Sequence, residues 1–251
     1  MRGGPLRAAV GLLAPALGAL GCGGAAPLLH PAQVLPPDEV TIGAGFSSQF
    51  RVGPAISEAD PVAERVLDEA AFSPGLAPWV AARMGLDSDF EVGLTYTGRT
   101  ARLDLRHAFD LGAPTLSIGL GASGLLPKRH DDLGFRVSGA GGDLPILLGL
   151  RSSGDVFAGW IGARGGFEIL DGSHDLPSGP DTAVLAPVTE DVKGWRTFAG
   201  GLVGLRVGFR HIFGAIELDG AMHWAKGTVG PTEVSFHQFA LSPAGALIGQ
   251  F

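Results

Sequence analysis

Apolar and polar side chains alternate along most of the chain after residue 40, in segments of about ten residues. In the first segment, residues 40–52, the even-numbered positions are mainly apolar and the odd-numbered positions are small or polar. Similar segments follow, some of them less regular; they are 75–86, 89–99, 102–106, 115–123, 135–151, 155–170, 194–210, 212–224 and 231–242. A period of two is typical of a β-strand with one apolar face. The sequence therefore predicts an all-β fold of about ten antiparallel strands, within a range of eight to twelve.

Two architectures share this alternation. A soluble sandwich or lipocalin-like barrel buries the apolar face around a core or a ligand cavity, whereas a membrane barrel turns that face to lipid. The polar face of the predicted strands consists mainly of Gly, Ser and Thr, with sparse Arg, Asp and Glu. Small residues and opposite charges suit the narrow, filled interior of a small barrel better than a water-facing surface. This composition favours an up-and-down transmembrane β-barrel, and the soluble barrel stays the alternative.

The connections between the predicted strands alternate in length. If the first strand starts in the periplasm, the periplasmic turns are all short; they are 86–88, 110–113, 152–154 and 210–212. Three of the five opposite connections, 53–74, 125–134 and 171–193, are long, and 98–100 and 226–231 are short. Short periplasmic turns and long external loops are typical of membrane barrels. We expect both ends of the barrel domain to be periplasmic, because an even number of strands returns the chain to its starting side.

The first long connection also predicts a helix. Asp60 followed by Pro61 is a helix-start signal, and Val62, Val66 and Ala70 follow at helical spacing. Acidic side chains surround these positions; they are Glu58, Glu64, Asp68 and Glu69. We expect a short acidic helix outside the barrel, and a mobile surface loop at 171–193.

Composition restricts the partners. The 251 residues carry 18 Lys+Arg and 25 Asp+Glu, for a net charge of −7 without a basic cluster, which argues against nucleic acid. The single Cys excludes a disulfide framework and a Cys-rich metal site. No cofactor is expected.

The N-terminus has the pattern of an export signal. Arg2 and Arg7 precede a short apolar stretch, residues 8–20, and small residues follow it up to Cys22. The sequence Ala-Leu-Gly-Cys at 19–22 resembles the bacterial lipobox, although Ala19 stands where that family usually has Leu. The resemblance implies cleavage before Cys22 and lipidation of its thiol; cleavage by an ordinary signal peptidase is the alternative. The expected organisation is a signal peptide at 1–21, a lipid-anchored or extended tether at 22–39, and a barrel domain at 40–251.

The C-terminus carries a second resemblance. The chain ends in Phe251, with Leu241 and Leu247 on the same side of the last predicted strand. This resembles the terminal aromatic signature of bacterial outer-membrane β-barrels, which their assembly machinery reads. It implies a location in the outer membrane and two partners, membrane lipid and the barrel-assembly machinery acting through Phe251. Such barrels usually have aromatic girdles, and with one Tyr in the chain these would come from its 14 Phe and from Trp79, Trp160, Trp195 and Trp224.

Charged residues on the polar faces are expected to meet in the lumen as an ion network. The predicted members are Asp89, Glu91, Arg102, Asp104, Arg106, Arg206, Arg210, Glu217 and Asp219. Charges in a narrow interior need partners, because an isolated buried charge is costly. Glu217, Asp219 and His223 also share one face of one predicted strand, which would suit an acid–base or weak metal site. We prefer the structural interpretation of these three residues and predict no metal site.

The expected function is that of a non-enzymatic, integral outer-membrane β-barrel with a structural, adhesive or narrow-channel role. A barrel of about ten strands is largely filled by side chains, so specificity would lie in the external loops, whose ligand the sequence does not identify. One alternative is a soluble lipocalin-like lipoprotein, periplasmic or at the surface, that binds an apolar ligand. A second alternative is a barrel hydrolase acting on lipid or peptide through His223 with Glu217 or Asp219.

Overall fold

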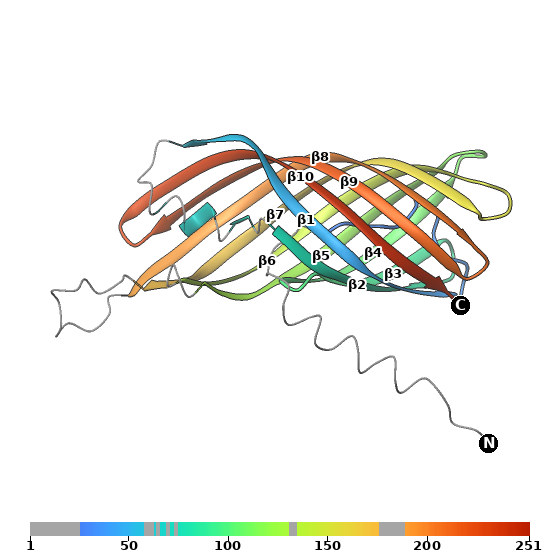
Figure 1. Ribbon diagram of the computed structural model, residues 1–251, viewed down its shortest axis with the longest axis horizontal. Helices are drawn as coiled ribbons and strands as arrows, with labels where there is room; N and C mark the ends of the chain where they lie inside the picture. The colour runs from blue at the N-terminus through green and yellow to red at the C-terminus, as the bar shows by residue number, and fades with distance from the viewer. Residues whose placement is uncertain are drawn as a thin grey trace, which may run out of the picture.

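The computed structural model is a closed barrel of ten antiparallel strands, each paired with its sequence neighbours, and with β1 paired to β10 (Figure 1). The strands are β1 (Val40–Ser57), β2 (Gly75–Gly85), β3 (Phe90–Tyr96), β4 (Thr100–Asp110), β5 (Thr115–His130), β6 (Phe135–Arg151), β7 (Phe157–Asp175), β8 (Thr189–Phe209), β9 (Ile212–Val229) and β10 (Thr232–Gln250). The structure describes residues 26–57, 63, 66–68, 71–72, 75–130, 135–175 and 189–251. The predicted fold class is confirmed.

The apolar face of the strands points outward. On β9, Ile212, Ile216 and Leu218 are 69%, 61% and 45% exposed, whereas Phe213 and Glu217 between them are buried. The same division holds on β1, where the apolar even-numbered side chains lie outside. Because the closed sheet leaves no free edge and its outer surface is apolar, the barrel has the surface of a membrane protein. The lipocalin-like alternative is wrong, since that fold turns its apolar face inward.

Aromatic side chains flank this outer surface at both ends. Exposed Phe residues lie near one end of the strands; they are Phe90, Phe109, Phe157, Phe209 and Phe251. Towards the other end lie Phe167, Trp195, Trp224 and Phe239. Along β7, along β8, and from Phe239 on β10 to Phe251, the two groups are about 10 to 14 residues apart, which at a strand tilt of about 45° is a height of about 23–33 Å. Trp79 and Trp160, also expected on the outside, are instead buried in the lumen.

We call the two ends the terminal mouth and the loop mouth. The terminal mouth holds Val40, Phe251 and four short connections, which are 86–89, 111–114, 152–156 and 210–211. Val40 and Phe251 close the barrel there through two main-chain hydrogen bonds of 3.0 and 2.9 Å. The loop mouth holds the connections 58–74, 97–99, 131–134, 176–188 and 230–231. The predicted alternation of lengths is present, but the long loop expected at 125–134 is wrong, because β5 and β6 continue to 130 and from 135.

Two segments outside the strands fill the lumen. The N-terminal segment, residues 26–39, lies towards the terminal mouth, where the side chains of Leu28, Leu29 and Ala32 are buried. A tether was expected here; for residues 26–35 that expectation is wrong, because apolar side chains pack inside the wall instead of extending into solvent.

The first connection supplies the second filling segment. Its described residues 63, 66–68 and 71 are helical and lie within the barrel near the loop mouth (Figure 1). Val66, Leu67 and Phe72 are 1% exposed or less, and they pack against lumen-facing residues such as Val137 and Phe236. A helix was predicted correctly, but its placement outside the barrel is wrong. Its apolar side chains, not its acidic ones, decide where it lies. Among the described residues, no helix is both long enough and apolar enough to span a membrane.

Candidate functional site: the lumen network and the N-terminal segment

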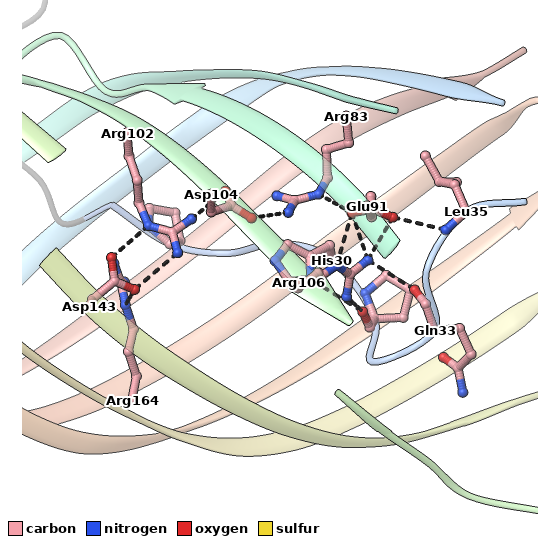
Figure 2. Close-up of polar contacts among 12 residues, drawn as sticks. His30, Gln33, Leu35, Arg83, Glu91, Arg102, Asp104, Arg106, Asp143 and Arg164 are labelled. Carbon is pink, nitrogen blue, oxygen red and sulfur yellow. Dashed lines mark hydrogen bonds and ion pairs between the residues drawn. The ribbon is translucent and has the colours of Figure 1, made fainter. Parts of the chain in front are cut away.

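Seven charged side chains form a continuous row of ion pairs on the lumen wall (Figure 2). In order along the row they are Arg106, Glu91, Arg83, Asp104, Arg102, Asp143 and Arg164. Arg102 Nε lies 2.8 Å from Asp143 Oδ1, and Arg164 Nε lies 2.8 Å from Asp143 Oδ2. Every member has a side chain exposed by 10% or less. Four guanidinium groups face three carboxylates, so each carboxylate lies between two cations.

The local sequence explains why the row forms. On β4, the residues 102, 104 and 106 alternate with outward-facing leucines and therefore share the lumen face. The neighbouring strands carry Gly93 and Gly121 opposite Asp104. A Cβ atom at Gly93 would lie 2.6 Å from Cζ of Arg83, so the glycine leaves the space that this long side chain occupies.

The wall residues bind the main chain of the N-terminal segment. Glu217 on β9 accepts hydrogen bonds from the backbone N–H groups of Leu28 and Leu29, at 2.7 and 2.9 Å. The same carboxylate accepts a bond from Trp160 Nε1 at 3.2 Å. Both oxygens of this buried carboxylate are therefore used to hold the segment and its flanking tryptophan.

Members of the ion row continue this main-chain binding. Arg106 donates to the carbonyl oxygens of Pro31 and Gln33, and Glu91 accepts from Leu35 N–H at 2.9 Å (Figure 2). Farther into the lumen, Arg164 donates to the carbonyl of Ala26 at 2.6 Å. The row is thus both a wall of paired charges and a set of contacts for the segment.

Three arginines contact the inward-folded helix or the residue that follows it. Arg51 pairs with Asp68 at 2.6 Å. Arg196 donates to the carbonyl of Ala71, and Arg99 contacts the carbonyl of Phe72 at 3.5 Å. Cations at a helix C-terminus complement the partial negative charge of its free carbonyls. Between the helix and the N-terminal segment, a cavity of about 70 Å³ remains, lined in part by Arg164, Asp219 and His223.

Most predicted members of the lumen network lie in the lumen. Glu91, Arg102, Asp104 and Arg106 belong to the ion row, and Glu217 holds the segment. Arg206 pairs with Asp155 at 2.8 Å and lies over the ring of Phe213. Asp219 lines the cavity between the helix and the N-terminal segment.

Two predicted members lie elsewhere. Asp89 and Arg210 occupy turns at the terminal mouth, with positive φ angles of 60° and 58° and exposed side chains. Their placement in the lumen is wrong, because the strand alternation stops where the chain turns.

The structure does not bring Glu217, Asp219 and His223 together as a catalytic group. Glu217, Asp219 and His223 share the lumen face of β9, as predicted. At about 3.3 Å per residue, however, His223 lies about 13 Å along the strand from Asp219 and about 20 Å from Glu217. His223 packs instead between Phe72 and Phe198, with ring centroids at 4.8 and 5.6 Å. Among the described residues, no group of three or more His, Cys, Asp or Glu is arranged to hold a metal ion.

Sequence reasoning missed Arg83, Asp143 and Arg164. Arg83 continues the buried set Trp79 and Ala81 on β2, so its parity alone was a usable signal. Asp143 and Arg164 lie beside Gly-rich stretches that obscure the alternation. The role of the N-terminal segment left no signal in its composition, which also fits a linker.

No family model matches the sequence, and no curated protein matches it. Solved structures with a similar fold are small bacterial outer-membrane β-barrels. Neisserial surface protein A is 10% identical over 85% of this chain and 96% of its own, with a TM-score of 0.31. The toluene transporter TodX of Pseudomonas putida is 7% identical over 86% and 90%, with a TM-score of 0.33. Ail, the attachment invasion locus protein of Yersinia pestis, is 10% identical over 86% and 100%, with a TM-score of 0.25. At these values the alignments assign no role to any residue of this chain.

Proposed function

We propose that the chain is an integral outer-membrane β-barrel whose lumen is closed by two segments of its own, and that its role is structural or adhesive. The observation that carries the membrane location is the apolar outer surface flanked by aromatic residues at both ends. The terminal mouth would face the periplasm, and the loop mouth the exterior. Phe251, exposed at the end of β10, is in place to be read by the assembly machinery.

The closed state follows from what fills the lumen. The N-terminal segment occupies the side of the terminal mouth, and the helix occupies the side of the loop mouth. The cavity left between them has a volume of about 70 Å³. A narrow channel would require one of these segments to move, so we propose that the resting protein does not conduct.

Two measurements test this proposal together. Membranes are washed with carbonate or urea, and the retained protein is run on a gel with and without boiling. We expect retention in the outer membrane and a faster-migrating unboiled band. Release by the wash would refute the membrane location. Purified protein in a planar lipid bilayer should then give no steady conductance; a stable open channel would refute the closed resting state.

We also propose that the protein is not an enzyme. Glu217 is already bound to the N-terminal segment, and His223 is packed between two aromatic rings. Lipid or peptide hydrolysis by the purified protein that disappears in His223→Ala, with the unboiled band unchanged, would overturn this proposal.

A further inference from the structure

The wall of the lumen binds the N-terminal segment mainly through its backbone. In residues 26–35, seven hydrogen bonds from the wall go to main-chain atoms; the segment residues are Ala26, Pro27, Leu28, Leu29, Pro31, Gln33 and Leu35. A side-chain bond is made by Gln33, to Thr115 at 3.3 Å. Main-chain contacts of this kind do not depend on which side chains the bound peptide carries.

Selectivity comes from two apolar pockets in the wall. Leu29 packs against Trp79, Phe213 and Ile248. Leu28 and Ala32 pack in a second cluster, which contains Leu147, Trp160 and Leu202. The pockets therefore select apolar side chains at two adjacent positions and a small one three residues later, while the charged wall binds the backbone between them.

Prolines fit the segment to this site. The buried residues Pro27 and Pro31 have no N–H group that would need a partner in the lumen. The residues Gln33, Val34 and Pro36 also line an open cavity of about 690 Å³ at the terminal mouth. The site is therefore reached from that mouth.

We propose that the terminal half of the lumen is a binding site for a proline-containing apolar peptide, and that the N-terminal segment is its resident, displaceable occupant. The resident segment is covalently attached, so its effective concentration is of millimolar order and it excludes a free peptide in the wild-type protein. A chain whose own segment is weakened in its apolar contacts, with the wall untouched, binds the same peptide from solution.

The experiment uses the full chain with Leu28→Ser and Leu29→Ser, folded in detergent, and a fluorescent synthetic peptide of residues 26–37. Fluorescence anisotropy should show saturable binding below about 1 mM peptide, where the wild-type chain shows none. A matched peptide carrying the same two serines should bind at least tenfold more weakly, because both pockets lose their apolar side chain. Adding Glu217→Gln to the weakened chain should also reduce binding by at least tenfold, because two backbone donors lose a carboxylate acceptor.

Two results would overturn the proposal. One is a folded double variant, with its unboiled gel band intact, that binds the peptide no better than the wild type. The other is equal binding of the two peptides, which would mean nonspecific association. If the double variant does not fold, the single variant Leu29→Ala takes its place and must meet the same criteria. The wash and gel assays on the same samples report on the barrel alone, so failure of peptide binding is distinguishable from failure of the membrane proposal.

Discussion

Arg102 on β4 and Asp143 on β6 form a two-pronged ion pair across the strand that separates them, with Nε–Oδ1 at 2.8 Å and Nη2–Oδ2 at 3.0 Å. Gly121 of β5 lies beneath the pair. A Cβ atom there would lie 2.5 Å from both Arg102 Nη2 and Asp143 Oδ1. The pair therefore requires a glycine at position 121, in the strand between its two partners.

A valine at position 121 should break this pair. The expected loss in the free energy of unfolding for Gly121→Val is about 3 kcal/mol, the usual cost of separating a buried ion pair. Gly124→Val is the matched control, because it is on the same strand and a Cβ there meets nothing within 4 Å. Urea unfolding in lipid vesicles, followed by tryptophan fluorescence, gives both values. Equal stability of the two variants would mean that the pair contributes nothing.

Glu217→Gln should loosen the N-terminal segment without unfolding the barrel. The amide group of Gln can accept from one of the two backbone donors, Leu28 or Leu29, but it turns an N–H group towards the other. Loss of a hydrogen bond to a charged group costs about 1.5–3 kcal/mol, so the amides of the segment should exchange with deuterium about ten- to a hundredfold faster. Glu233→Gln, on the exposed face of β10, is the control. Unchanged exchange in Glu217→Gln would contradict the role assigned to this carboxylate.

The strands could be predicted from the sequence because a barrel imposes a strict period of two on each of them. That period also placed Glu91, Arg102 and Asp104 on the lumen face. It could not place Asp143 or Arg164, because the glycines beside them have no side chain to reveal a face. It could not reveal the inward fold of residues 26–35 either. Their position depends on Glu217 and Arg106, which are distant in sequence, and on pockets that exist only once the barrel has closed.

The apolar outer surface predicts a depth-dependent cost for a charge. Leu218 lies midway along the outer face of β9, and Ile212 lies at its terminal-mouth end. Leu218→Arg should lower the free energy of unfolding in vesicles by about 2–4 kcal/mol, whereas Ile212→Arg should cost about 1 kcal/mol or less. The same urea titration measures both. Equal costs would argue against a bilayer centred on this part of the barrel.

Cys22 lies outside the described residues, and its lipidation stays a prediction. Wild-type cells fed a fatty-acid probe should label the protein, and Cys22→Ala should remove the label. The variant should keep its faster-migrating unboiled band, because the barrel begins at Val40 and does not depend on the anchor. Labelling that persists in Cys22→Ala would refute lipidation at this thiol.

His30 should make the attachment of the N-terminal segment sensitive to acid. It belongs to the segment and not to a strand, and burial, together with the charges of Arg106 and Arg83, holds its pKa well below the ordinary value of 6.5. The ring is therefore neutral in the bound segment, where Nδ1 lies 3.2 Å from the carbonyl of Pro31. Once the segment is released or the protein unfolds, His30 takes up a proton below pH 6.5.

Because the released state binds the additional proton, stability is fully present above pH 6.5 and is lost as the pH falls below it, by up to about 1.4 kcal/mol per pH unit. The free energy of unfolding measured at pH 7.5, 6.5 and 5.5 should fall in the wild type. In His30→Gln the decline should be smaller, and His211→Gln, at an exposed turn, should follow the wild type. Parallel pH dependence in the wild type and His30→Gln would show that another group carries the acid sensitivity.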